Sequence, residues 1–224
     1  MFERDVLELL NKLFEKHDYV IMAGGSGLYI NAVCNGFDEL PETDMVLRNQ
    51  LQEEFAMKGM EYLQSRLKQL DPIYYNEVDL SNPQRIIKAL EVCISSGLPY
   101  SSFRKGLKIQ RDFHIIKIGL QLPREELYNR INKRVEKMMN DGLLEEATTL
   151  FHHRERNALQ TVGYQELFDH LDGKISLSEA TKKIKQNTRR FAKRQMTWFR
   201  REKEIEWFET GNVDEILEHL HWRL

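Results

Sequence analysis

Residues 19–23 form a short apolar run, Tyr-Val-Ile-Met-Ala, that leads directly into Gly24-Gly25-Ser26-Gly27. A run that is apolar on both faces is typical of a strand buried in a parallel sheet, and helical patterns precede and follow it. Glycine permits tight turns, so we expect the backbone to turn at the carboxyl end of this strand, where open α/β sheets bind their ligands. The run therefore predicts an α/β fold with a binding loop at residues 24–27.

Most of the remaining sequence has a helical pattern. Helices are expected at 2–16, 28–34 and 45–70, the last broken by Asp71-Pro72, and Asn82-Pro83 caps another that ends at Ser96-Gly97. A second strand is expected at 113–122, and Pro123 opens the next helix. Later helices are expected at 143–153, 161–171, 177–200 and 213–221, with a short strand at 205–208. Two or three strands are few for a parallel sheet, so we expect an incomplete one.

Charge is distributed unevenly along the chain, although its formal net value is only −2. Residues 181–203 contain ten basic side chains and one acid, a net charge of +9, so the remainder carries −11. In this segment Ile184, Phe191 and Trp198 recur every seven residues, and we expect them to face the core. The basic residues form two stripes, Lys182, Lys185, Arg189 and Lys193 in one and Lys183, Arg190, Arg194 and Arg201 in the other. A solvated face usually mixes signs, so this helix favours nucleic-acid contact over a merely solvated surface.

The two cysteines, Cys34 and Cys93, lie far apart in apolar runs and form no metal or redox motif. Two buried thiols are typical of a reducing compartment. No run approaches the ~18 apolar residues that a membrane span needs, and no signal peptide opens the sequence. We therefore expect a cytoplasmic protein that does not enter a membrane.

Two segments near the expected starts of helices contain residues that could bind a ligand. For each of them a purely structural role is the alternative. Ser26 at the tip of the glycine loop can approach a phosphate or a base, or the loop is only a tight turn. Gln84 and Arg85 follow the Asn82 cap, where free amides and the helix dipole favour anions. The alternative is that both are solvated polar residues.

Two later segments leave similar alternatives open. Arg130 and Arg134 share one helix face, so they can clamp a diphosphate, or pair with Glu126 and neighbouring acids. In residues 159–164, Thr161 is a candidate helix cap and Tyr164 can stack on a base. Ordinary helix-start chemistry explains the same residues without a ligand.

In order along the chain, these segments resemble the tRNA dimethylallyltransferase (isopentenyltransferase) family. Residues 23–29, Ala-Gly-Gly-Ser-Gly-Leu-Tyr, resemble its Gly-Gly-Thr-Gly-Leu-Tyr loop, with Ser26 in place of Thr. Residues 82–92 resemble its Asp-Pro-Gln-Arg helix, and residues 158–164 and 187–200 are similar to two later motifs. One such motif is weak evidence, whereas four in family order over nearly the whole chain are specific.

The resemblance implies an α/β fold related to P-loop kinases, with a parallel-sheet core that is incomplete here, a helical insertion domain and a helix-rich C-terminal part. Residues 1–40 are expected in the P-loop-type core, 41–79 in the insertion, and 80–224 in the remaining core and C-terminal tRNA-binding helices. The implied reaction transfers a dimethylallyl group from its diphosphate to the exocyclic amine of the adenosine 3′ to the anticodon, assisted by magnesium, on a flipped base. The expected partners are a tRNA anticodon stem-loop and dimethylallyl diphosphate.

The resemblance also implies the site residues. Ser26 is expected to hold the base or substrate near the reacting centre, and Arg130 or Arg134 to face the diphosphate. No residue of this chain is expected to hold the metal. Contacts with tRNA are expected from Gln84, Arg85, Ile86, Ile87, Lys88, Leu159, Gln160, Thr161, Val162, Gly163, Tyr164, Lys193, Arg194, Gln195, Met196, Thr197, Trp198, Phe199 and Arg200.

The family pattern begins with a P-loop strand and helix, followed by a strand with a general-base Asp, and nothing in these 224 residues matches them. We therefore expect a piece of a longer protein, inactive alone and monomeric when complete. Two alternatives remain: a non-catalytic RNA-binding fragment, and an adenylate isopentenyltransferase that acts on a free nucleotide. The +9 segment argues against the second, because a free nucleotide needs no such surface.

Overall fold

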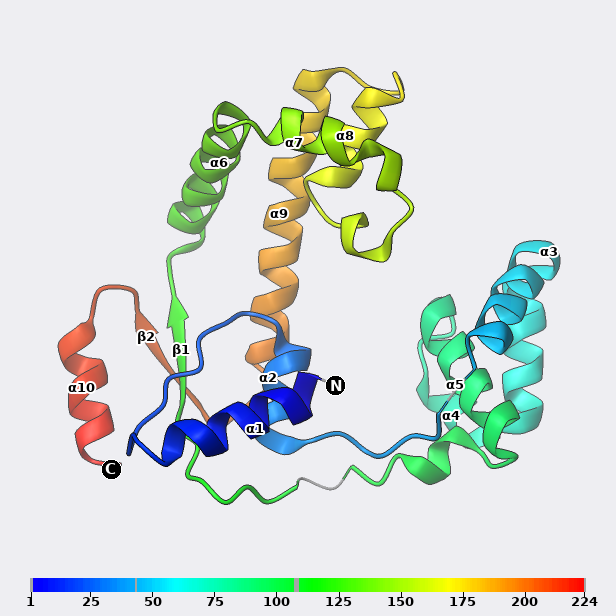
Figure 1. Ribbon diagram of the computed structural model, residues 1–224, viewed down its shortest axis with the longest axis horizontal. Helices are drawn as coiled ribbons and strands as arrows, with labels where there is room; N and C mark the ends of the chain where they lie inside the picture. The colour runs from blue at the N-terminus through cyan, green and yellow to red at the C-terminus, as the bar shows by residue number, and fades with distance from the viewer. Residues whose placement is uncertain (1, 43, 107–108, 224) are drawn as a thin grey trace. The chain divides into compact units, whose positions relative to one another are not determined.

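The structure, a computed structural model, describes residues 2–42, 44–106 and 109–223 (Figure 1). The chain divides into two compact units, one of residues 1–22 and 28–113 and the other of residues 23–27 and 114–224. Each unit has an apolar cluster of its own. The described residues are mostly helical and include one small parallel sheet, which confirms the predicted α/β class.

The first unit is built from helices that begin and end at local signals. The Asn82 side chain accepts the N–H of Arg85 at 3.2 Å, and Gly97, with φ 71°, ends the same helix in the left-handed conformation. Both signals were predicted. The helices are α1 (Phe2–Phe14), α2 (Gly27–Asn35), α3 (Met45–Leu70), α4 (Pro72–Glu77) and α5 (Pro83–Ser96), followed by a 3₁₀ turn, η1 (Tyr100–Phe103).

Helices α3, α4 and α5 share one apolar cluster, whose buried members are Leu51, Leu63, Leu67, Tyr74, Ile86, Ile87, Ala89 and Leu90. The fully buried carboxylate of Asp71 joins the end of α3 to η1. It accepts the N–H of Tyr74 at 2.9 Å, and the N–H and hydroxyl of Ser101 at 2.6 and 2.8 Å. The cluster extends past the expected boundary at residue 79 into α5, and the domain boundaries stay a prediction.

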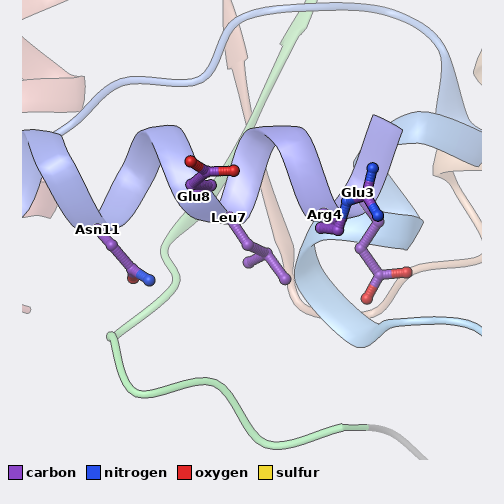
Figure 2. Close-up of a pocket in the computed structure, with 5 residues that line it drawn as sticks. All are labelled: Glu3, Arg4, Leu7, Glu8 and Asn11. Carbon is purple, nitrogen blue, oxygen red and sulfur yellow. The ribbon is translucent and has the colours of Figure 1, made fainter. Parts of the chain in front are cut away.

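Helix α1 is tied to α2 by Arg111, which donates to the Glu3 carboxylate at 2.7 Å and to the Val33 carbonyl at 2.8 Å. The ring of Phe2 also stacks on that of Tyr29, with centroids 4.4 Å apart. Figure 2 shows a shallow pocket on α1, lined by Glu3, Arg4, Leu7, Glu8 and Asn11. The lining contains two acidic side chains and one basic side chain, whereas a phosphate-binding surface is predominantly positive.

The second unit combines a two-stranded parallel sheet with helices. Strand β1 (Lys117–Gln121) pairs with β2 (Ile205–Glu209) in a register that runs from Lys117 opposite Ile205 to Gln121 opposite Glu209. The helices are α6 (Arg124–Asn140), α7 (Leu143–Leu150), α8 (Tyr164–Leu171), α9 (Leu177–Phe199) and α10 (Val213–His221), with 3₁₀ turns η2 (Phe151–His153) and η3 (Asn157–Leu159). The core of this unit lies between α6, α7, α8 and α9, at Val135, Leu143, Ala147, Leu167, Phe168, Ala180 and Ile184.

The strand predicted at residues 19–23 is wrong: these residues have no regular secondary structure, and Ile21 is 92% exposed. A strand needs a hydrogen-bonded neighbour, and the two strands found in the described part of the chain, β1 and β2, pair with each other. The strand predicted at 113–122 is confirmed in a shorter form, beginning at Lys117. No helix formed by the described residues is long and apolar enough to cross a membrane.

Candidate nucleic-acid interface

Helix α9 carries the basic segment and is anchored in its N-terminal half. Ser176 caps it, because its hydroxyl accepts the Glu179 N–H at 3.2 Å while the Glu179 carboxylate accepts the Ser176 N–H at 2.9 Å. Ile184 is buried in the core, as predicted. Phe191 and Trp198 are 52% and 42% exposed, so the expectation that they face the core is wrong. The buried residues of α9 lie near its start, and its C-terminal half presents these rings to solvent.

The two basic stripes of α9 have different surroundings. In the first, Lys185 lies 2.6 Å from the Glu136 carboxylate of α6, and Arg189 donates to the Asn132 side chain at 2.7 Å. These two side chains connect α9 to α6. The Glu136 carboxylate offsets the charge of Lys185, whereas Asn132 is neutral and only fixes the position of the Arg189 guanidinium. The second stripe is exposed throughout, at Lys183, Arg190, Arg194 and Arg201.

A shallow groove follows the second stripe, lined by Arg190, Lys193, Arg194, Thr197, Trp198 and Arg201. Four of these six residues are cations, and no acidic residue is among them. Cations neutralise backbone phosphates, and an exposed indole offers a face on which a base can stack. Arg190 and Arg201 were absent from the predicted contacts, although their place in the second stripe was a signal for them.

A buried carboxylate connects this groove to the segment before α8. Glu166 is 4% exposed; it accepts the Gly163 N–H at 2.8 Å and the Asn187 amide at 2.7 Å. The Asn187 oxygen in turn accepts a bond from Arg190 at 3.2 Å. Because each group holds the next, Glu166 orients Arg190 and fixes the loop at Gly163.

The rest of residues 159–164 serves mainly structural contacts. Thr161 is not the cap of α8, because the helix begins at Tyr164 and Gly163, with φ 108°, occupies the capping position. The Tyr164 hydroxyl donates to Glu146 at 2.5 Å, and its ring stacks on Phe168. The hydrogen bond to Glu146 and partial burial raise the pKa of Tyr164. These contacts favour the structural alternative for Tyr164.

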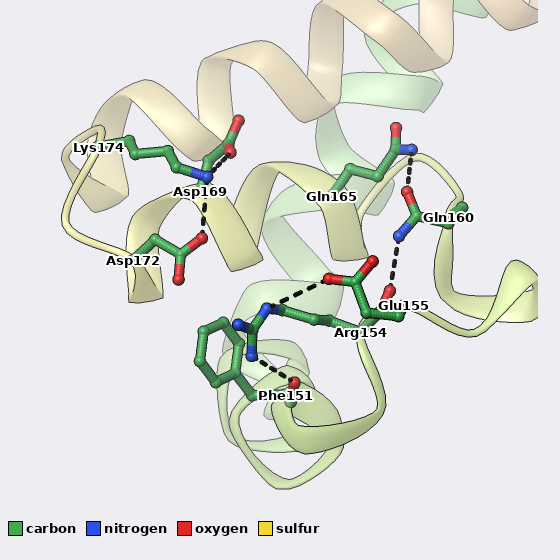
Figure 3. A network of polar contacts seen from close by, with 8 residues as sticks. All are labelled: Phe151, Arg154, Glu155, Gln160, Gln165, Asp169, Asp172 and Lys174. Carbon is green, nitrogen blue, oxygen red and sulfur yellow. Dashed lines mark hydrogen bonds and ion pairs between the residues drawn. The ribbon is translucent and has the colours of Figure 1, made fainter. Parts of the chain in front are cut away.

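Gln160 belongs to a chain of hydrogen bonds between α7 and α8 (Figure 3). The Gln165 amide donates to the Gln160 oxygen at 3.0 Å, and the Gln160 amide donates to the Arg154 carbonyl at 2.6 Å. Leu159 and Val162 pack against the core of the unit. Within this segment, Gln160 and Thr161 are the exposed members, so they are the ones placed to meet a partner.

The glycine loop at residues 23–27 belongs to the same unit as α9. The Gln195 amide donates to the Gly25 carbonyl at 2.7 Å, and Ser26 is exposed. None of the loop's glycines has a positive φ, so the left-handed conformation that favours glycine is not used in this loop. Two of these glycines instead allow side chains of α9 to approach the loop backbone closely. A Cβ at Gly25 would lie 2.0 Å from the Gln195 nitrogen, and one at Gly27 would lie 2.1 Å from the Trp198 nitrogen.

Arg130 and Arg134 both lie on the exposed side of α6. Arg130 donates to the Glu126 carboxylate at 2.7 Å, so the structure favours the ion-pair alternative for this residue. Arg134 has no carboxylate within ion-pair distance among the residues that the structure describes. Of the two guanidinium groups, that of Arg134 is therefore the one available to an anion.

The predicted contacts at the start of α5 lie in the first unit and divide into two groups. Gln84 and Arg85 are exposed, whereas Ile86 and Ile87 are 0% and 1% exposed. The isoleucine side chains form part of the core, so at this helix start Gln84 and Arg85 are the residues whose side chains are open to a partner. The tRNA contacts of this segment stay a prediction. Lys88 lies 3.4 Å from the fully buried Glu91 carboxylate, to which the Arg48 guanidinium also comes within 3.3 Å.

The described part of the chain brings together no group of three or more His, Cys, Asp or Glu side chains that could hold a metal ion. The magnesium expected from the resemblance stays a prediction.

The fold and the groove together define an α/β protein whose helical second unit presents a cationic, aromatic surface suited to nucleic acid. A family model described as IPP transferase matches residues 1–202. The chain is 49% identical to tRNA dimethylallyltransferase 1 of Bacteroides fragilis over 98% of its length and 73% of that protein. It is 51% identical to the tRNA dimethylallyltransferase of Christiangramia forsetii over 93% of its length and 69% of that protein.

Among solved structures, the tRNA isopentenylpyrophosphate transferase of Bacillus halodurans matches with a TM-score of 0.63 at 32% identity, over 99% of this chain and 71% of that one. The chain belongs to the IPP transferase family, the family of the tRNA dimethylallyltransferases. The predicted family and the predicted enzyme class, a prenyltransferase, are both confirmed.

Proposed function

We propose that this chain takes part in transfer of a dimethylallyl group from dimethylallyl diphosphate to the exocyclic amine of the adenosine 3′ to the anticodon of tRNA. The observation that carries the proposal is the groove on α9, where four cations accompany an exposed indole. The cations suit backbone phosphates and the ring suits an unstacked base. A free nucleotide has no use for so extended a cationic surface, which disfavours the adenylate isopentenyltransferase alternative.

In the proposed reaction the amine nitrogen forms a bond to C1 of the dimethylallyl group. The bond from C1 to the diphosphate oxygen breaks, its electron pair leaves with the diphosphate, and the amine gives one proton to a carboxylate general base. We propose that Arg134 faces the departing diphosphate, since Arg130 is paired with Glu126. Ser26, exposed in the glycine loop, is proposed to contact the target base.

We further propose that the protein acts as a monomer in the cytoplasm. The proposed groove and the loop with Ser26 come from one chain, so the site needs no second copy. Cys34 and Cys93 are both buried and form no disulfide, in keeping with a reducing compartment.

RNA binding is tested with a labelled anticodon stem-loop that carries the target adenosine. We expect the 224-residue chain to bind the stem-loop, and adenosine monophosphate in large excess to leave the RNA bound. Displacement of the RNA by the free nucleotide would support the adenylate isopentenyltransferase alternative instead. No binding at low salt would refute the assignment of the groove to RNA.

Transfer is tested with labelled dimethylallyl diphosphate and the same stem-loop. Two proteins are compared: the chain alone, and the chain with the P-loop segment of the family and the following strand that carries the general-base Asp joined to its start. We expect label in the RNA with the joined protein, since the printed residues include no Gly-x-x-x-x-Gly-Lys-Ser/Thr sequence. RNA binding without transfer by either protein would favour a non-catalytic RNA-binding function.

A further inference from the structure

The glycine loop and the end of α9 make two independent contacts, although about 170 residues of sequence separate them. The first is the hydrogen bond from the Gln195 amide to the Gly25 carbonyl, 2.7 Å long. The second is the packing of Gly27 against the Trp198 indole, so close that a Cβ on Gly27 would lie 2.1 to 2.7 Å from three ring atoms. These contacts flank Ser26 on both sides.

The same helix segment also forms the cationic groove. Trp198, which packs on Gly27, is a lining residue of the groove, together with Lys193 and Arg194, the two residues directly before Gln195. Gln195 itself is only half-buried and lines no part of the groove. The resemblance assigned Gln195 to tRNA contact, but its amide is already used by the loop.

From these contacts, and resting on the proposed RNA-binding function, we infer that Gln195 and Trp198 are positioning residues that hold Ser26 beside RNA bound in the groove. The Gln195 hydrogen bond fixes the loop before Ser26, and the indole fixes the loop after it. Without them the loop would be a short exposed segment with few contacts, and such segments move freely. RNA bound in the groove then covers Ser26, because the Trp198 ring both lines the groove and packs against the loop at Gly27.

The glycines of the loop supply a matched pair of variants. A methyl group on Gly27 meets the rigid indole of Trp198, which must move, whereas a methyl group on Gly24 meets nothing within 4 Å. Gly27→Ala should therefore release the loop, and Gly24→Ala should not. For the hydrogen bond, Gln195→Ala removes the donor, and Gln186→Ala is its control, since Gln186 is an exposed glutamine of the same helix.

The first measurement needs no RNA. Heteronuclear NOE values of the Gly25 and Ser26 amides report fast loop motion in ¹⁵N-labelled protein. We expect these values to fall in Gln195→Ala and in Gly27→Ala, and to stay as in the parent in the two controls. Values that are unchanged in both Gln195→Ala and Gly27→Ala would overturn the inference, whatever the RNA does.

The second measurement places Ser26 relative to bound RNA. With the substitution Ser26→Cys, the new thiol should react quickly with a water-soluble disulfide reagent, because position 26 is exposed. Cys34 and Cys93 are buried and should contribute little to this signal. One neutral hydrogen bond is worth about 1 kcal/mol, or roughly a fivefold change in an equilibrium. We accordingly expect saturating stem-loop to slow the reaction by about 10-fold in the parent and about twofold with Gln195→Ala.

The affinity of the stem-loop separates this inference from the proposed function. Since the cations of the groove remain, we expect Gln195→Ala to change the dissociation constant by less than about threefold. Tight RNA binding with no protection of the thiol at position 26 would overturn the inference and leave the proposed function intact. Absence of RNA binding in the parent would instead refute the proposed function, and the loop-motion result would still decide whether Gln195 holds the loop.

Discussion

Replacing Lys193 and Arg194 together with alanine is expected to weaken anticodon stem-loop binding and to flatten its salt dependence. Both side chains are exposed, and both line the groove on α9. Each phosphate contact releases condensed counterions, so its loss lowers the slope of log affinity against log salt by about 0.7 on a single strand and about 0.9 on a duplex. If both residues contact phosphates, the slope should fall by about 1.4 to 1.8.

This slope difference predicts a deficit in affinity that depends on salt. Over a fourfold increase in salt, from about 50 to about 200 mM, the deficit of the double variant relative to the parent should shrink by about 7- to 12-fold. Fluorescence anisotropy of a labelled stem-loop, measured at four salt concentrations, gives both slopes. Circular dichroism establishes that the variant is folded before its affinity is interpreted.

A control with the same loss of charge separates a groove from a general effect of net charge. Lys137→Ala combined with Lys185→Ala also removes two positive charges, but these lysines are paired with Asp141 and Glu136 at 2.8 and 2.6 Å. We expect this control to change the slope by less than about 0.5, because distant surface charges are screened. Equal flattening in both double variants would refute the reasoning, since RNA would then respond only to net charge.

Three further outcomes are expected. Asp71→Ala should destabilise the first unit by about 3 kcal/mol, because a buried carboxylate loses three hydrogen bonds, and an unchanged urea midpoint would contradict this. In the protein with the joined P-loop segment, Arg134→Ala should slow single-turnover transfer about 100-fold at saturating RNA, and Arg130→Ala much less; the reverse order would exchange their roles. The raised pKa of Tyr164 should add stability below the ordinary tyrosine pKa of 10.0, and that stability should be lost as pH rises through the raised value. Urea unfolding between about pH 8 and 11 measures this loss, and Tyr164→Phe, which keeps the ring but cannot donate to Glu146, should remove it.

Sequence reasoning succeeded where the signal lies within a few residues. The cap at Asn82 and the helix end at Ser96-Gly97 depend on hydrogen bonds between near neighbours, so the bounds of α5 could be predicted closely. The single-sign charge of residues 181–203 is likewise visible without a fold. Family motifs then supplied the reaction class, which the comparisons confirmed.

Sequence reasoning failed where the outcome depends on which distant segment packs against a residue. The apolar pattern at residues 19–23 could not show whether a neighbouring strand is present. The recurrence of Ile184, Phe191 and Trp198 every seven residues could not show how far the core extends along α9. Within one short motif, Arg85 is exposed and Ile86 is buried, because the contacts with α3 decide which face of α5 is covered.

The amino-acid sequence by itself therefore determined the helices of this protein, its basic segment and its family. The tertiary structure decided what the individual residues contact. In the first stripe, Lys185 and Arg189 bind side chains of α6, whereas other cations of α9 line the groove. The tertiary structure also assigned Gly25 and Gly27 to close contact with Gln195 and Trp198, since contacts across 170 residues arise only when the chain is folded.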